Sequence, residues 1–210
     1  MERLNYNMYL EMAQAYEVGL VGPSGARAFV PRKARIWQCS SKSMYEFLPQ
    51  AAFYAFVAAI RLRPCIILAG SGLTAPIAYV AAKITGSRSL VYLHGLDIAV
   101  ENSFYQGLWR PFFRHFDIVF VNSEFTKSLA AKAGIVTSKI VILHPGVDLP
   151  DMKTSQQMRK IFRHHYHLGK NPLMLYVGRI TPRKGLTVFV KDILPSIIKP
   201  RFRKCGCCGL

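Results

Sequence analysis

The chain alternates short apolar runs with stretches in which apolar residues recur at helical spacing. An apolar run bounded by turn residues is typical of a strand buried in a sheet. Such runs occupy residues 17–21, 65–69, 89–98, 117–122 and 139–148, and another opens the segment 173–194. The run at 89–98 carries polar groups at its carboxyl end.

The segments between these runs predict helices. An apolar stripe over residues 4–16 opens the chain, and glycines end the predicted helices 75–86 and 124–134, the second of which is capped by Ser123. Residues 154–171 predict a polar helix or linker. Strands that alternate with helices indicate an α/β fold with a parallel sheet, whose ligands bind at the carboxyl ends of the strands.

Composition supports a folded protein with anionic partners. Of the 210 residues, 51% are apolar, which is enough for a sizeable core. The net charge of +17 favours nucleic acid, anionic lipid or phosphorylated small molecules. The excess is greatest in residues 150–210, which hold 13 basic and 2 acidic side chains.

The cysteines indicate an intracellular protein, and the longest uncharged run does not indicate a membrane span. Cys39 and Cys65 stand alone and the others crowd residues 205–208, so no disulfide framework can be assembled and a reducing compartment is expected. The first residues lack a secretory signal pattern. The longest uncharged run, 64–82, contains turn residues and is interpreted as strand, turn and helix.

Four ordered stretches carry a resemblance to a known family. They are "YLHGLDI" (92–98), "DIVFVNSEFTKSLAAKAGI" (117–135), "KIVILHPGVD" (139–148) and "LYVGRITPRKGL" (175–186). In this order the chain resembles glycosyltransferase family 4, the group 1 glycosyltransferases, in which two Rossmann-like domains clasp a nucleotide-sugar in the GT-B fold.

The resemblance implies a hexosyltransferase-type enzyme that transfers sugar with retention of configuration. It implies a nucleotide-sugar donor and a surface-glycan or lipid-linked acceptor, as in lipopolysaccharide or exopolysaccharide biosynthesis. It implies no cofactor, no metal and no specific nucleic-acid partner. The expected location is the cytoplasm, with peripheral contact at the cytoplasmic face of an anionic membrane.

The resemblance also divides the chain. Residues 1–150 correspond to the acceptor-side Rossmann-like domain, 151–172 to an interdomain linker helix, and 173–200 to the start of the donor-binding domain, with an aberrant tail at 201–210. Family members place a strand and a glycine-rich loop before the first helix, and a pair of glutamates late in the donor domain. Because neither is found here, we expect a chain truncated at both ends and impaired in catalysis.

Two cations near the end of the chain are the expected diphosphate clamp. Cleavage of the anomeric C–O bond builds negative charge on the diphosphate, and fixed guanidinium and ammonium groups stabilise that charge. By resemblance, Arg179 and Lys184 supply these groups, while Gly178 lets the backbone approach the donor. A solvated loop with ordinary surface charges is the alternative.

His94 is the expected catalytic residue. It lies at the carboxyl end of a predicted strand, where the family places a histidine that contacts the donor sugar. An isolated histidine there is more often a hydrogen-bonded structural group, so the functional interpretation depends on the resemblance. Gly95, Asp97, Gly146 and Asp148 are expected to line the cleft, with Asp97 orienting His94 or its loop.

Two other functions remain open at this stage. The turn Gly70-Ser71-Gly72 fits the start of a dinucleotide-binding fingerprint, but the ribose-binding acid that should end the next strand is missing. A non-catalytic basic protein that binds nucleic acid or a membrane surface is the other alternative, although no nucleic-acid-binding signature is found.

Two further segments favour structural roles. His164 and His167 could share a helical face, but without a third ligand they indicate a solvated helix, not a metal site. The aromatic and basic segment 109–116 fits either a membrane-surface patch or a core-packed helix with surface arginines, and the second is favoured.

Overall fold

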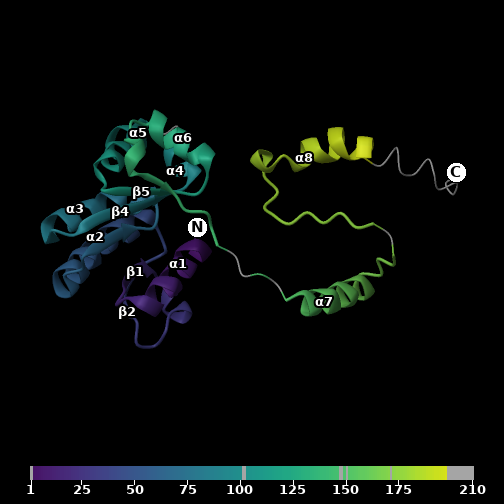
Figure 1. Cartoon of the computed structure of the whole chain (residues 1–210), viewed down its shortest axis with the longest axis horizontal. Coiled ribbons are helices and arrows are strands. Elements are labelled where there is room, and N and C mark those ends of the chain that lie inside the picture. The colour runs from purple at the N-terminus through teal and green to yellow at the C-terminus, as the bar shows by residue number, and fades with distance from the viewer. Residues whose placement is uncertain (1, 101–102, 147–148, 150, 171, 198–210) are drawn as a thin grey trace, which may run out of the picture. The chain divides into compact units, whose positions relative to one another are not determined.

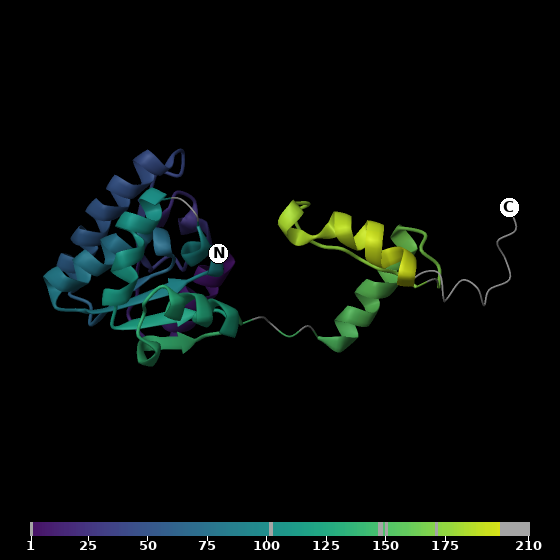
Figure 2. The same ribbon diagram turned by 90° about the horizontal axis from the view of Figure 1, so that it is seen from above.

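We describe a computed structural model of the chain, which places residues 2–100, 103–146, 149, 151–170 and 172–197. The chain divides into two compact units, residues 1–148 and 149–210. Each unit is described by itself (Figures 1 and 2).

The larger sheet of the first unit has four parallel strands. They are β3 (Ile66–Ala69), β4 (Arg88–Leu93), β5 (Ile118–Val121) and β6 (Ile140–Ile142), paired in that order. The register sets Val91 opposite Ala69 on one side and Val119 on the other. This confirms the predicted α/β fold with a parallel sheet and brings the carboxyl ends of four strands to one edge.

A separate two-stranded parallel sheet comes earlier in the chain. It pairs β1 (Gly19–Pro23) with β2 (Arg35–Cys39). Among the placed residues, no ladder joins it to the larger sheet. The sequence patterns had not indicated β2 or the long helix α2 (Met44–Leu62) that follows it.

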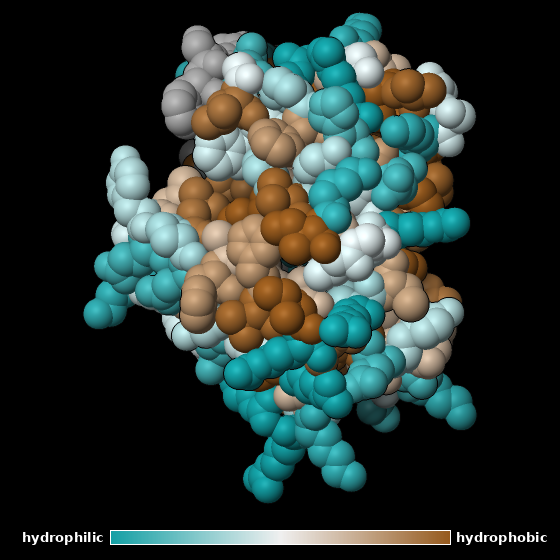
Figure 3. All heavy atoms as spheres, turned by 90° about the vertical axis from the view of Figure 1, so that its left-hand side faces the viewer, coloured by the Kyte–Doolittle hydropathy of each residue, from teal (hydrophilic) through white to brown (hydrophobic). Residues whose placement is uncertain are grey.

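Helices α2 and α3 connect the two sheets. Helix α3 (Ala75–Thr85) packs on β3 and β4, whereas α2 packs on β1 and β2, and the two helices contact each other (Figure 1). Every buried residue of either helix is an alanine. On the outside these helices expose large apolar side chains, including Phe53, Ile60 and Ile84, on a surface where apolar and charged groups alternate (Figure 3).

The helix end signals are confirmed. Gly86 closes α3 in a left-handed conformation, and the Ser123 side chain accepts from the Thr126 amide to cap α6 (Glu124–Lys132). Gly134, at φ 85°, follows α6. Helix α1 (Glu2–Ala15) forms as predicted, although Tyr16 lies beyond its end.

The core of the first unit fills the space beside the larger sheet. Val91, Val119 and Val121 from the strands pack with Phe113 and Phe116. Those two rings are fully buried, so the aromatic segment is a core element as favoured from the sequence. Shorter elements around it are η1 (Ala26–Phe29), η2 (Gly72–Thr74), α4 (Gly95–Ala99), α5 (Ser103–Leu108), η3 (Arg110–His115) and η4 (Thr137–Lys139).

The second unit is helical and open. It contains α7 (Met152–His165), η5 (Pro182–Lys184), α8 (Leu186–Val188) and a π-helical segment, Phe189–Ile193. The strand predicted at the start of 173–194 is wrong for this structure: residues 172–177 have no regular secondary structure, and Val177 is 85% exposed. A lone apolar run finds no neighbouring strand here, and an unpaired strand leaves its backbone groups in solvent.

In the part of the chain that is placed, no helix combines the length and the apolar character needed to cross a bilayer. His167 lies outside α7 at φ 51°, so it does not share a helical face with His164. The placed residues hold no group of three metal-ligating side chains.

Candidate functional site

His94 stands where β4 ends and caps α4. The His94 side chain faces the Asp97 amide and the Asp97 side chain faces the His94 amide, which is a capping box. Its Nε2 atom is buried and has no hydrogen-bond partner among the placed residues. A neutral ring that carries its proton on Nε2 presents an unpaired donor at this position.

The surroundings of His94 favour that neutral ring. Burial lowers the pKa of His94 below its ordinary value, and the Asp97 carboxylate and the backbone of Gly70 partly oppose this effect. The ring lies 5.0 Å from the ring of Tyr92, which is itself buried in β4. His94 therefore offers a hydrogen bond without a positive charge.

Asn5 supplies a complementary group from the first helix. A Cβ added to Gly70 would lie 2.7 Å from the Asn5 amide nitrogen, so the Asn5 side chain rests directly on the turn after β3. The Asn5 Oδ1 atom is also buried and lacks a partner in the described part of the chain. An unpartnered ring nitrogen of His94 and an unpartnered oxygen of Asn5 thus both adjoin Gly70.

Asp97 fixes the turn between these groups. Its Oδ2 accepts from the His94 amide at 2.9 Å and from the Gly72 amide at 3.2 Å. A dinucleotide-binding loop presents its glycine amides to a pyrophosphate. Since the Gly72 amide is already bound by a carboxylate, the turn Gly70-Ser71-Gly72 does not fit that alternative.

The ends of β5 and β6 complete this edge of the sheet. The Asn122 side chain accepts from Thr126 Oγ1 at 2.6 Å, and the Asn122 carbonyl lies 3.2 Å from His144 Nδ1. Thr126 lies 3.4 Å from the position of a Cβ on Gly95. The sequence analysis did not name Asn5, Asn122, Thr126 or His144, although a polar residue directly after an apolar strand was a usable signal for Asn122 and His144.

The other predicted cleft residues fall in different surroundings. Gly95 begins α4 beside His94. Gly146 follows β6, is exposed and has open space around it. Asp148 lies outside the described residues.

The predicted clamp residues belong to the second unit. Arg179 and Lys184 are both exposed. The Tyr176 hydroxyl donates to the Arg179 carbonyl at 3.1 Å and lies 3.1 Å from the position of a Cβ on Gly178, so these residues form one compact loop. Gly185, at φ 66°, turns the chain into α8. The two units are placed separately, so the structure does not bring the clamp and His94 together.

Comparison with known proteins identifies relatives of the chain. The family model of Glycosyltransferase Family 4 matches residues 1–150. A protein named GDP-mannose-dependent alpha-(1-6)-phosphatidylinositol monomannoside mannosyltransferase, from Mycobacterium tuberculosis, is 32% identical over 130 residues, which are 60% of this chain and 34% of that protein. Its namesake from Mycolicibacterium smegmatis is 30% identical over 77 residues, or 37% of this chain and 20% of that protein.

Solved structures share the fold. Crystal structures of Anabaena Alr3699/HepE, in complex with UDP and with UDP-glucose, each match with a TM-score of 0.65 and 15% identity, covering 88% of this chain and 52% of theirs. The chain thus spans about a third of the length of its curated relatives. The family model covers most of the 210 residues, and the chain belongs to glycosyltransferase family 4.

Proposed function

We propose that the chain is the acceptor-side part of a retaining, nucleotide-sugar-dependent hexosyltransferase. The observation that carries this proposal is the pair of buried, unpartnered atoms beside Gly70, Nε2 of His94 and Oδ1 of Asn5. Unpaired buried polar groups are rare and call for a ligand or a functional explanation.

A sugar hydroxyl satisfies both atoms. When the neutral His94 ring carries its proton on Nε2, the hydroxyl oxygen accepts from this N–H, and the hydroxyl proton is donated to Asn5 Oδ1. Both partners are neutral, as suits a neutral sugar, and the edge of a parallel sheet is where such folds bind ligands. Asp97 supports the site by holding the turn and the histidine, and is a positioning residue.

The donor diphosphate is assigned to the second unit. Arg179 and Lys184 bind its oxygens and stabilise the charge that develops as the anomeric C–O bond breaks, which removes the need for a metal. The acceptor hydroxyl oxygen forms the new bond to the anomeric carbon on the same face, and its proton passes to the departing phosphate oxygen. The configuration is therefore retained.

The relatives guide the choice of substrates. The mycobacterial proteins are named for GDP-mannose and a phosphatidylinositol mannoside, and the HepE structures hold UDP or UDP-glucose. We therefore propose a hexose donor and a glycan or lipid-linked acceptor. An acceptor of the second kind would place the protein at the cytoplasmic face of a membrane.

Saturation-transfer NMR on the full chain, with GDP-mannose or UDP-glucose as the ligand, tests this proposal because it detects the binding of each nucleotide-sugar. We expect weak binding, with Kd on the order of millimolar, that is lost at high salt. Arg179→Ala or Lys184→Ala should abolish it, whereas the matched control Arg159→Ala, on the exposed surface of α7, should not. His94→Ala should weaken saturation of the sugar protons more than that of the base protons.

Two outcomes contradict the proposal. Equal loss in Arg159→Ala would show that the nucleotides respond to overall charge. Retention of duplex DNA or RNA at physiological salt, together with no response to either nucleotide-sugar, would favour the alternative of a basic nucleic-acid-binding protein.

A further inference from the structure

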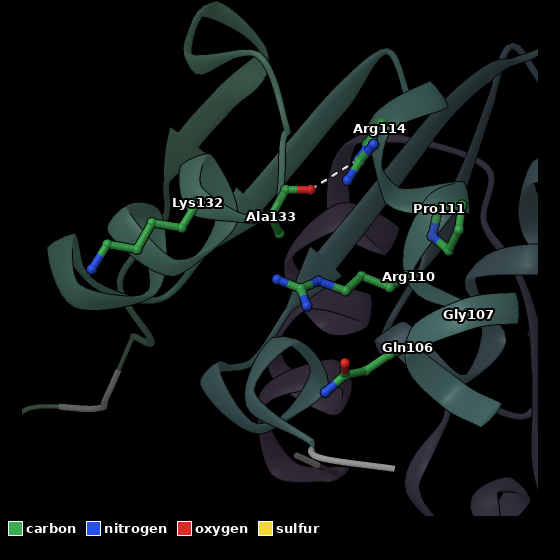
Figure 4. Close-up of a pocket in the computed structure, with 7 residues that line it drawn as sticks. All are labelled: Gln106, Gly107, Arg110, Pro111, Arg114, Lys132 and Ala133. Atoms are coloured by element: carbon green, nitrogen blue, oxygen red, sulfur yellow. Dashed lines mark hydrogen bonds between the residues drawn. The ribbon is translucent and has the colours of Figure 1, made fainter. Parts of the chain in front are cut away.

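A basic cavity lies on the first unit, and its lining includes neither His94 nor Asn5. It is open to solvent and has a volume of about 530 Å³, which is enough for a small ligand. It is formed by α5, η3 and the end of α6, and its lining consists of Gln106, Gly107, Arg110, Pro111, Arg114, Lys132 and Ala133. Figure 4 shows these residues, with Arg110 and Gln106 extending from the helical side into the space.

The aromatic neighbours of the two arginines explain why they face this cavity. Phe113 and Phe116 are fully buried in the core, so Arg114, which lies between them, turns outward, whereas Arg110 at the start of the segment is only partly exposed. The indole of Trp109 donates to the Leu73 carbonyl at 2.9 Å, which fixes the start of the segment. The arginines are thus held on a rigid backbone and not on a free loop.

Arg114 is locked in place. Its Nε donates to the Ala133 carbonyl at 2.9 Å, at the carboxyl end of α6, where a cation is favoured (Figure 4). Its guanidinium also packs on Gly134, since a Cβ there would lie 2.9 Å from Arg114 Cζ. Among the placed residues, its two terminal nitrogens make no hydrogen bond, so they remain available to a ligand.

Arg110 is the least satisfied cation. Its Nε is buried and has no hydrogen-bond partner within the described ranges. Among the same residues, no carboxylate pairs with Arg110, Arg114 or Lys132; the ion pairs found there join other residues. Within the described ranges, three positive charges thus line one cavity without a paired carboxylate, and only Arg110 has a buried polar atom that lacks a partner.

We propose that this cavity binds a phosphate group, carried by a small phosphorylated molecule or by a phospholipid headgroup. The planar forks of Arg110 and Arg114 match the spacing of phosphate oxygens and can bind them in pairs. Lys132 also lines the cavity, and although its side chain extends away from the two arginines in Figure 4, it is long and flexible and adds positive charge at the rim. Gln106 offers a neutral hydrogen bond to the rest of the ligand. The proposal does not depend on the sugar transfer proposed above.

Calorimetric titration of the full chain with sn-glycerol 3-phosphate tests the site. We expect saturable binding with Kd on the order of 0.1–1 mM, and none with glycerol. Arg110→Gln should weaken binding about tenfold, as expected for loss of a charge-assisted hydrogen bond. Lys132→Gln, at an exposed position, should weaken binding about threefold. Because this substitution lies on the surface, it tests the site even if Arg110→Gln fails to fold.

A matched control and a second arm complete the experiment. Arg61→Gln removes a charge that is exposed, as that of Lys132 is, from the last turn of α2, and it should leave binding unchanged. The second arm measures whether the chain floats with phosphatidylcholine vesicles that contain phosphatidylglycerol. If this flotation requires Arg110, a phospholipid headgroup is the source of the phosphate group. The proposal would be overturned if Arg61→Gln weakened binding as much as Arg110→Gln does, or if malonate bound as well as sn-glycerol 3-phosphate. It would also be overturned if the titration gave no saturable heat and the vesicles carried no protein.

Discussion

The Asp97 carboxylate accepts a hydrogen bond from the backbone amide of Gly72 at 3.2 Å, joining the turn after β3 to the turn after β4. The same oxygen also holds the His94 amide at 2.9 Å. One side chain thus organises the strand ends on which the proposed sugar site depends.

Replacement of Asp97 should loosen this edge of the sheet. Asp97→Ala leaves two part-buried amides without an acceptor, so we expect the free energy of unfolding to fall by ~2–3 kcal/mol. Asp97→Asn keeps an acceptor oxygen and should cost less. In both variants the pKa of His94 should fall further, because the Asp97 charge raises it. Urea denaturation and NMR titration measure the two effects; equal damage by Asn and Ala would contradict this role.

Gly72 leaves no room for a side chain. A Cβ there would lie 2.6 Å from the Tyr105 hydroxyl and 2.8 Å from Asp97 Cβ. We expect Gly72→Ala to destabilise the first unit by ~1–3 kcal/mol in urea denaturation. Gly107→Ala is the matched control, because nothing lies within 4 Å of the added Cβ, and in α5 it should stabilise by ~0.5–1 kcal/mol. Similar results for the two variants would contradict the packing argument.

Acidification should destabilise the first unit through His94. In the unfolded chain this histidine takes up a proton below pH ~6.5, whereas the folded ring, with its lowered pKa, takes it up only at lower pH. The unfolded state binds more protons in that window, so the melting temperature should decrease from pH ~7.5 to pH ~5.5.

His94→Gln tests the origin of this pH dependence, since glutamine does not titrate. We expect the slope of melting temperature against pH to flatten in the variant. An unchanged slope would assign the effect to other groups. The Asp117 carboxyl, whose pKa is lowered by hydrogen bonds from Ser89, contributes its stability above pH ~4 and loses it below, so it acts outside this window.

The second unit should exchange its amide hydrogens rapidly. None of its described residues is buried, and the apolar run around Val177 packs against no sheet. We expect low protection in α7 and residues 172–197 and high protection in β4, measured by hydrogen–deuterium exchange. For the same reason we expect the chain on its own to transfer sugar poorly. Slow exchange across 172–197 would contradict both statements.

Local signals explain what the sequence predicted well. Strand β4 and helix α6 were predicted because an apolar run, a serine cap and a glycine stop are read from neighbouring residues. The site depended on contacts between distant segments: Asn5 meets Gly70, 65 positions later, and no periodicity encodes that. The prediction of a strand before Arg179 was wrong although the local apolar pattern is typical of a strand. A strand also needs a neighbouring strand to pair with, and the pattern does not encode one.

The buried residues of α2 and α3 are all alanines, so we expect shear between these two helices to be easier than between other elements of the first unit. Without shared ladder hydrogen bonds, the small sheet is connected to the large one chiefly through these two helices. Alanine methyl groups form shallow ridges that do not interlock as leucines do, so small shear displacements between the helices meet little resistance. We therefore expect that any displacement of the β1–β2 pair relative to the edge that holds His94 occurs at the α2–α3 contact and leaves the core around Phe113 in place.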